Sequence, residues 1–277
     1  MDTKVASPEI TVIRPERGWA PLRFRELWAY RELIYFLVWR DVKVRYKQTA
    51  IGVAWAVIQP LFMALLFSVV FAQLAGLPTG GVPPFLFYYV ALLPWNLFAK
   101  GLTEGSTTLV TNQRLITRVY FPRLILPVAT VLAGVIDFGI GLAVLVGLLA
   151  YYGFWPSLAI VTLPLFSLVA ILSAMGIAFW LSSIDARYRD VRYALPFLTQ
   201  VWFFATVVVP LESIPTSWRW LYGLNPMAGV VSGFRWALVG TGTLDPLVWL
   251  SVLIIVVIFV GGLYYFRRSE RIFADVV

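Results

Sequence analysis

The stretch VWRDVKVRYKQTAIGVAWAVIQP, residues 38–60, places a dense group of cations directly before a long apolar run. Arg40, Lys43, Arg45 and Lys47 fall within eight residues, and the next charged residue is Lys100. Such a junction is typical of a chain that runs along a membrane surface and then enters the bilayer. It predicts a membrane protein rather than a soluble domain.

The composition agrees with this prediction. Of the 277 residues, 60% are hydrophobic and only 13% are charged, whereas about a quarter are charged in a soluble domain. The absence of cysteine excludes disulfides and thiolate metal sites, and the absence of histidine removes the commonest general base. A lipid phosphatase that depends on histidine is therefore excluded.

Six apolar runs have about the length that a membrane-spanning helix needs. They cover residues 52–75, 85–110, 124–151, 157–182, 194–209 and 246–266. Between the last two, residues 210–245 are aromatic but interrupted by proline and glycine, which predicts one or two short re-entrant or interfacial helices. We expect an all-α integral membrane fold: a cytoplasmic segment 1–51, a transmembrane domain 52–266 and a cytoplasmic tail 267–277.

The distribution of lysine and arginine predicts the orientation of these spans. Segments 1–51, 111–123, 183–193 and 267–277 would share one side and together hold nineteen of the cations, against two on the opposite side. Both termini should therefore be cytoplasmic. The first ~30 residues are charged and lack an apolar core, so we expect no cleaved signal peptide.

The cationic segment itself is predicted to be an amphipathic helix at the cytoplasmic interface. Helical spacing aligns one mostly aromatic stripe: Trp28, Tyr35, Trp39, Val42 and Tyr46. Arg40, Lys43 and Lys47 form the neighbouring stripe. The helix could act as a topology anchor, or its cations could contact phosphate headgroups or an acidic protein surface; the two interpretations are compatible.

The loop TNQRLITRVYFPR, residues 111–123, is longer than a plain turn requires. Arg114 and Arg118 are four residues apart and share a helical face, while Leu115 and Val119 share the next. Pro122 should end this short helix. A solvated turn is one interpretation, but the length favours a docking element for a cytoplasmic partner.

Four stretches resemble the membrane subunit of ABC-2-type exporters, in particular the permeases that export O-antigen and related polysaccharides. They are FRELWAYRELIYFLVWRDVKVRYKQTAIGVAWAVIQPL (24–61), NQRLITRVYFPRLILP (112–127), ARYRDVRYALPFLTQ (186–200) and LNPMAGVVSGFR (224–235). The resemblance implies an interface helix before the first span, a coupling helix in the first cytoplasmic loop and short helices at the periplasmic exit. It also implies two permeases working with two ATPase subunits in the bacterial inner membrane.

The resemblance implies roles for individual residues. The coupling helix would contact the ATPase through Asn112, Arg114, Leu115, Arg118 and Val119. The cargo would be an undecaprenyl-diphosphate-linked polysaccharide such as O-antigen. Its diphosphate is anionic, so we expect Arg40, Lys43, Arg45 and Lys47 to receive it at the cytoplasmic mouth.

No phosphate-binding loop of the type G-x-x-x-x-G-K-[ST] occurs in the sequence, since GLTEGSTT at residue 101 lacks the lysine. We therefore expect no cofactor and no enzymatic activity in this chain, with ATP and Mg²⁺ on the partner ATPase. The other expected partners are a second copy of the chain and membrane lipids, with no nucleic acid.

Three ionisable residues lie within the predicted spans: Lys100, Glu104 and Asp137. Such groups are costly in lipid and are functional candidates. Lys100 and Glu104 are spaced to pair along one helix, which favours a structural role. Three isolated groups do not form a proton relay, and this disfavours a proton-coupled transporter.

Aromatic residues are expected to line the path of a glycan, because the C–H faces of sugars pack on rings. The candidates are Trp55, Phe62, Trp202, Phe203, Phe204, Trp218 and Tyr222. Other cargo remains open: capsule, teichoic acid, or a smaller lipid or drug. Of other classes, a membrane glycosyltransferase would need acidic outer loops, where only Glu212 and Asp245 occur, and a scaffold or a channel without an energy source also remains.

Overall fold

The computed structural model describes residues 24–47, 52–209, 214–241, 246–270 and 273, and these contain helices and no strand. The helices before the second span are α1 (Phe24–Ala29), α2 (Arg31–Lys47), α3 (Ala54–Phe67) and its π-helical continuation η1 (Ser68–Leu74). The middle helices are α4 (Pro84–Thr111), α5 (Gln113–Arg118), α6 (Ile125–Tyr152), the 3₁₀ turn η2 (Leu158–Thr162) and α7 (Leu163–Asp185). The last are α8 (Val191–Phe203), its π-helical continuation η3 (Phe204–Val208), α9 (Thr216–Gly223), α10 (Pro226–Val239) and α11 (Pro246–Ser269).

The prediction of six spans is confirmed. Within the described residues, six helical segments are long and apolar enough to cross a membrane: Ala54–Leu74, Pro84–Thr111, Ile125–Tyr152, Leu158–Asp185, Val191–Val208 and Pro246–Ser269. Their ends lie within about three residues of the predicted ones, and the fifth is the shortest, as its sequence indicated. Local signals set several ends, such as Pro84 in the first turn of α4 and Gly153, which ends α6 with a φ of 68°.

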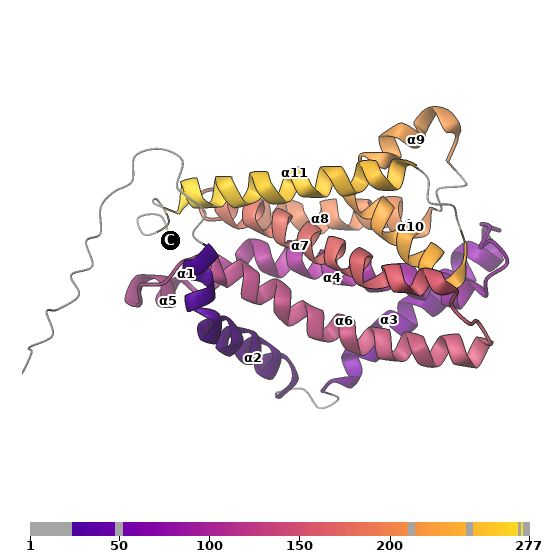
Figure 1. The fold of residues 1–277 in the computed structure, drawn as a ribbon, viewed down its shortest axis with the longest axis horizontal. Coiled ribbons are helices and arrows are strands. Elements are labelled where there is room, and N and C mark those ends of the chain that lie inside the picture. Colours follow the sequence, from indigo (N-terminus) through magenta and orange to yellow (C-terminus); the bar gives the residue numbers. More distant parts are fainter. Residues whose placement is uncertain (1–23, 48–51, 210–213, 242–245, 271–272, 274–277) are drawn as a thin grey trace, which may run out of the picture.

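The spans run along the long axis of an elongated bundle (Figure 1). α1, α5 and the last turns of α11 lie at one end, which we call the α5 end. α9 and the connections from η1 to α4 and from α6 to α7 lie at the opposite end, the α9 end. The loops that carry most of the cations therefore gather at one end, as six spans require.

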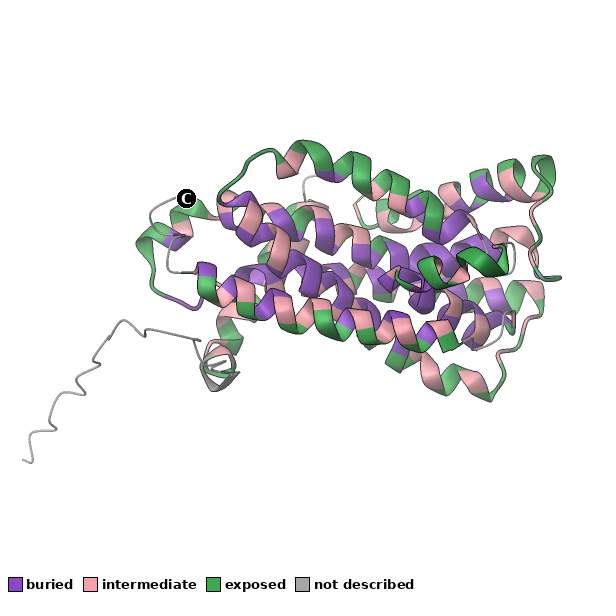
Figure 2. Ribbon diagram, turned by 90° about the horizontal axis from the view of Figure 1, so that it is seen from above, coloured by how far each residue is buried: buried purple, intermediate pink, exposed green. Residues whose placement is uncertain are grey.

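Helix α4 lies at the centre of the bundle and packs against α3, α6, α7 and α10, and the buried residues form a continuous central band (Figure 2). Small residues let its neighbours approach closely. A Cβ added to Gly101 would lie 2.7 Å from the Cβ of Ala174 on α7, and one added to Gly105 would lie 2.7 Å from that of Ala178. On the other side of α7, a Cβ on Gly176 would lie 2.8 Å from the Cα of Phe259 on α11.

The first and fifth spans both change from α-helical to π-helical geometry towards the α9 end. The two changes are neighbours in space, since the rings of Phe67 and Phe203 are 5.3 Å apart and those of Phe71 and Phe204 are 6.4 Å apart. π-Helical turns widen a helix and are frequent at functional sites. The α9-end halves of these two spans thus form one aromatic unit.

Two short helices occupy the stretch between the fifth and sixth spans, as predicted. α9 lies across the α9 end, and α10 packs against α4, α7 and α11. Most of α10 is buried, and its close packing shows at Gly233, where an added Cβ would lie 2.3 Å from the ring of Phe166. α10 is too short to span a membrane and is surrounded by protein, which is the condition for a re-entrant helix.

Candidate functional site

Helix α2 packs along α6 through a face that the sequence pattern did not identify. Leu37 is buried, and Tyr30 and Ile34 pack against the same cluster of apolar side chains. Trp28, Tyr35 and Trp39, in contrast, are 72%, 64% and 54% exposed. These three members of the stripe lie outside the bundle, where they can face the headgroup layer, whereas Val42 and Tyr46 are partly buried. The prediction of an interface helix stays a prediction.

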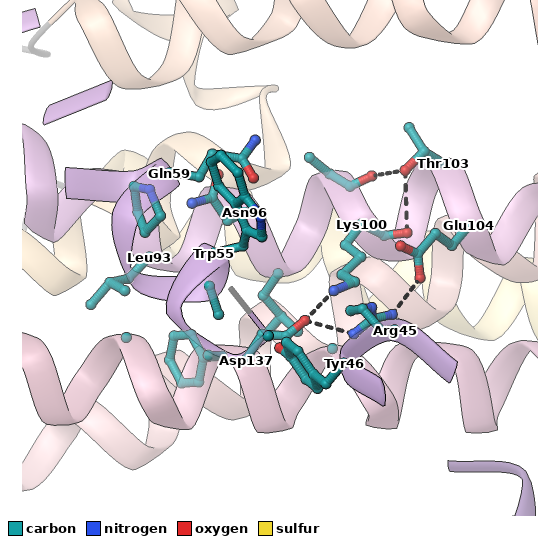
Figure 3. A pocket seen from close by; sticks show the side chains of 18 residues that line it. Arg45, Tyr46, Trp55, Gln59, Leu93, Asn96, Lys100, Thr103, Glu104 and Asp137 are labelled. Carbon is teal, nitrogen blue, oxygen red and sulfur yellow. Dashed lines mark hydrogen bonds and ion pairs between the residues drawn. The ribbon is translucent and has the colours of Figure 1, made fainter. Parts of the chain in front are cut away.

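At its C-terminal end, α2 contributes two side chains to a cluster of charges between the spans (Figure 3). Arg45 donates through Nη1 to Oδ2 of Asp137 on α6 at 2.7 Å, and through Nη2 to Oε2 of Glu104 on α4 at 2.9 Å. Lys100 on α4 donates to the same Oδ2 of Asp137. The hydroxyl of Tyr46 donates to Oδ1 of Asp137. These five residues form what we call the Asp137 cluster.

The meeting of Lys100 with Asp137 follows from helix geometry. α4 and α6 are consecutive, antiparallel spans, and each residue lies about 17 Å from the α5 end of its helix at 1.5 Å per residue. Opposite charges at the same depth can pair, and pairing lowers the cost of placing them in a span. The expected pair between Lys100 and Glu104 was wrong: Lys100 binds Asp137, and Glu104 binds Arg45.

The Asp137 cluster opens onto a cavity of about 510 Å³ between α2, α3, α4 and α6. Trp55 and Gln59 on α3 and Asn96 on α4 line it, together with apolar side chains (Figure 3). The segment Ala54–Leu74 is about 31 Å long, which matches the hydrocarbon thickness of a bilayer. Because the cavity lies beside the first turns of α3, it lies near the boundary of the apolar layer on the α5 side.

The charges in the cluster balance, with Arg45 and Lys100 against Glu104 and Asp137. Asp137 is the most enclosed of the four, with 18% of its side chain exposed, whereas Glu104 is 45% exposed. Burial, followed by the hydrogen bond to Asp137, raises the pKa of Tyr46 from 10.0 to about 12. Its hydroxyl therefore stays protonated and remains a donor at any physiological pH.

The four cations predicted to receive a headgroup do not form one surface. Arg40 pairs with its neighbour Asp41 at 2.8 Å, and Lys43 and Lys47 are exposed. Arg45 turns into the cavity instead. The predicted quartet is thus divided between an exposed cationic edge of α2 and the Asp137 cluster.

The loop between the second and third spans contains the predicted short helix, α5. Arg114 and Arg118 are exposed on it, Leu115 is partly buried, and Ile116 anchors it by packing into the apolar cluster beneath α2. Val119 follows the helix in an extended conformation and is 52% exposed. This placement leaves the two arginines accessible to a partner.

The base of this loop is tied to neighbouring elements. The side-chain amide of Asn112 donates to the carbonyl of Thr108 at 2.9 Å. The backbone N–H of Arg123 donates to Oε1 of Glu270 just beyond α11 at 2.9 Å, and Arg267 donates to Oε2 at 3.0 Å. These bonds join the loop after α5 to the end of the sixth span, and Asn112 to the last turn of α4.

The aromatic candidates for a lining fall into two groups. Trp55, Phe62, Phe204 and Trp218 are 50%, 62%, 41% and 61% exposed. Phe203 is buried, and Trp202 packs against Phe98 with ring centroids 5.0 Å apart. Phe203 and Trp202 support the packing of α8 against the bundle. Only the exposed group is therefore accessible for contact with a glycan.

Hydrogen bonds join α9 and α10 to the fifth span. The indole N–H of Trp202 donates to Oδ1 of Asn225 at 2.8 Å, and that oxygen also accepts from the N–H of Met227 at 3.0 Å, which caps α10. The hydroxyl of Tyr222 donates to carbonyl oxygens of Thr206 and Val209. Tyr222 is therefore a structural residue of this junction.

Several residues of the site were not identified from sequence. Gln59 and Asn96 look like ordinary polar residues in apolar runs, and Tyr46 was assigned to the aromatic stripe. The buried Arg235 was also missed: its guanidinium donates to the carbonyl of Val207 at 2.8 Å and lies 3.8 Å from the ring centroid of Phe87. Asp137 was named from sequence as an ionisable residue within a span, and its pairing with Lys100 had a signal, because Lys100 lies at the same depth on the neighbouring span. Glu212 and Asp245 lie outside the described residues.

Comparisons with known proteins identify the family. The family described as "ABC-2 type transporter" matches residues 32–239. The O-antigen export system permease protein RfbA of Myxococcus xanthus is 30% identical over 258 residues, which cover 89% of this chain and 96% of that protein. The RfbA protein of Klebsiella pneumoniae is 26% identical over 250 residues, with 89% and 95% covered.

A further relative is named for the transport of a different glycan. The polysialic acid transport protein KpsM of Escherichia coli is 26% identical over 246 residues, with 83% of this chain and 91% of that protein covered. The family match includes α2, α5 and α10, and the relatives are similar over almost their whole length. The chain is therefore a multi-pass membrane protein that belongs to the ABC-2 type transporter family.

Proposed function

We propose that this protein is the membrane-spanning permease subunit of an ATP-driven exporter for lipid-linked polysaccharide such as O-antigen. The similarity to permeases named for O-antigen and polysialic acid export carries the proposal. The cargo would be linked to undecaprenyl diphosphate and would move from cytoplasm to periplasm across the bacterial inner membrane. Six spans with an exposed loop helix at one end fit such a subunit.

The working unit would contain two copies of this chain and two ABC ATPase subunits, which bind ATP and Mg²⁺. The α5 end would face the cytoplasm and carry both termini, because the cation-rich loops gather there. Arg114 and Arg118 would dock on the ATPase. The tie between Arg123 and Glu270 supports transmission of a closing motion from α5 to the spans.

The two parts of the cargo match the two parts of the opening sequence stretch. The diphosphate would lie against the cationic edge of α2, while the polyprenyl tail stays in lipid beside α3. The exposed rings of Trp55 and Phe62 on α3 would offer packing surfaces to sugar faces. Trp218 on α9 would do so at the periplasmic exit.

Complementation tests this function directly. The gene is placed, with its ATPase partner, in a bacterial strain that lacks its own O-antigen permease, and surface polysaccharide is measured by immunoblot. The function requires that polysaccharide reaches the surface only when both chains are present. Accumulation of lipid-linked polysaccharide inside the cell, with the protein at normal level, would contradict it.

The headgroup assignment has a separate test in the same strain. Changing Arg40, Lys43 and Lys47 together to Gln should reduce export by roughly two orders of magnitude, because each cation contributes about 1 kcal/mol near an anionic group. Seven other N-terminal cations would still hold the orientation. Normal export at a normal protein level would leave α2 as a topology anchor only.

A further inference from the structure

Asp137 lies at the centre of a ring of donors that come from other helices. Arg45 and Lys100 both donate to its Oδ2, and the hydroxyl of Tyr46 donates to its Oδ1. Two cations and a hydroxyl that converge on one anionic group are also the donors that a phosphate oxygen prefers. Asp137 thus occupies the position in which a phosphate group would be bound.

We propose that the Asp137 cluster is a phosphate-type oxyanion site and that Asp137 is its counter-ion in the resting state. An incoming diphosphate displaces the carboxylate and takes over Arg45, Lys100 and Tyr46. The inference rests on the proposed function, because the cargo delivers such a group to this face of the membrane. It adds a second site inside the cavity, which the headgroup enters after the exposed edge of α2 has received it.

The cavity makes this exchange physically possible. It has a volume of about 510 Å³ next to the carboxylate, and it is only partly enclosed. Asn96 and Gln59 line the same cavity, and their amide groups are of the kind that donates hydrogen bonds to a released carboxylate. Arg45 does not have to move far, since it stays attached to Glu104 through its second nitrogen.

The resting counter-ion also gives selectivity. The cluster is balanced, so a headgroup with a single negative charge gains no more from Arg45 and Lys100 than Asp137 does already. A diphosphate carries at least two negative charges and can outcompete the carboxylate. The site would therefore reject the abundant phospholipids with one charge and accept a diphosphate.

The test uses the full chain in complex with its ATPase, in phosphatidylcholine nanodiscs, and measures the Kd of geranylgeranyl diphosphate. Asp137→Asn should tighten binding by about tenfold, because a neutral amide cannot compete for the cations. Lys100→Gln should weaken it by about tenfold. The matched control is Asp190→Asn, which makes the same change of net charge at an exposed position outside the cavity, and it should change the Kd by less than about twofold.

Two further probes identify the source of the oxyanion. Inorganic diphosphate should show the same tightening if the headgroup alone is recognised, whereas tightening limited to the prenylated probe means that the lipid tail is required. Phosphatidylglycerol should compete poorly with the prenylated probe in the wild type and better in Asp137→Asn. Tightening with both diphosphate probes and tightening with the prenylated probe alone each support the site.

The proposal is overturned if Asp137→Asn leaves the affinity unchanged, or if Asp190→Asn tightens binding equally. If Asp137→Asn does not assemble, Lys100→Gln and Tyr46→Phe decide the matter, because both must weaken binding in a folded complex. Failure here leaves the proposed function intact when the wild type still exports polysaccharide. If Asp137→Asn binds geranylgeranyl diphosphate more tightly but the wild type exports no polysaccharide, the proposed function is contradicted and the oxyanion site is not.

Discussion

Arg45 and Asp137 are 92 positions apart in the chain and 2.7 Å apart in the fold. Each charge at this depth is stabilised by a partner on another helix, because lipid cannot solvate it. Removing one partner would leave the other charged and enclosed, which costs more than the pair itself contributes. Single substitutions that remove a charge from the cluster should therefore also lower stability, and their effects on binding are compared in folded, assembled complexes.

The phenol of Tyr46 gives a prediction at this scale. Its pKa is raised to about 12, first by burial and then by the hydrogen bond to Asp137. A raised pKa means that the fold favours the protonated phenol, so this contribution to stability is complete below pH ~10 and is lost as the pH rises through ~12. Tyrosinate absorbance of the wild type minus that of Tyr46→Phe should give a difference curve with its midpoint near pH 12.

Asp137→Asn supplies the check on this titration. Without the carboxylate, the midpoint assigned to Tyr46 should move down towards 10, while the part of the shift caused by burial remains. A wild-type midpoint already at 10 would show that Tyr46 does not donate to Asp137 in solution.

At the scale of elements, helices α4, α7 and α11 are held together by small residues that face one another. Gly176 is closely packed against backbone, because an added Cβ would meet the backbone of Phe259 at 2.8 and 2.9 Å. A side-chain tip could rotate away, but a packed backbone cannot. The contact between α7 and α11 therefore depends on glycine at this position.

Gly176→Ala should destabilise the protein by about 1–3 kcal/mol, because the two helices must separate to accommodate the methyl group. The measurement is thermal unfolding in detergent, followed by loss of the monodisperse peak in gel filtration. Gly139→Ala on α6 is the matched control, since an added Cβ there meets nothing within 4 Å. Equal midpoints for the two variants would show that α7 and α11 are less closely packed.

The loop helix α5 carries a prediction about coupling. Arg114→Glu with Arg118→Glu should abolish cargo-stimulated ATP hydrolysis, because reversed charges on an exposed docking face oppose the partner's surface. Membrane insertion should be unaffected. Gln113→Glu with Thr117→Glu is a control that adds charge to exposed positions of the same helix and should have the smaller effect. If the purified, assembled complex with Arg114→Glu and Arg118→Glu shows the same cargo-stimulated ATP hydrolysis as the wild type, α5 is excluded as the coupling element.

At the scale of the whole molecule, the arrangement of the six spans fixes which loops share a side. α5 and the end of α11 lie together, and α9 lies opposite with the link between η1 and α4. The bias of lysine and arginine towards the α5 end then selects one of the two possible orientations.

Reporter fusions test this orientation. A reporter placed after residue 277 should be active only as a cytoplasmic fusion, and a cysteine introduced between residues 76 and 84 should react with an impermeant reagent from outside. The chain has no cysteine of its own, so the background is low. A reporter that reads as periplasmic at the C-terminus would require an odd number of spans or the opposite orientation of all six, and either would remove the basis for the site.

The number and positions of the spans were determined by the sequence, because the length of an apolar run is a local property that is compared with a fixed bilayer thickness. The short helices before the sixth span could also be predicted, since proline and glycine interrupt that stretch. α5 was predictable from the spacing of its arginines. Its role, like those of the headgroup and lining residues, stays a prediction.

The partners of each side chain were decided only by the tertiary structure. α2 is apolar on two faces, and helical periodicity could not tell that Leu37 would bind α6 while Trp39 stayed exposed. Lys100 was predicted to pair with Glu104 because sequence shows only neighbours on one helix. The depth and packing of α2, α4 and α6 instead bring Lys100 and Arg45 to Asp137, because opposite charges in an apolar bundle are stabilised by whichever partner lies at the same level.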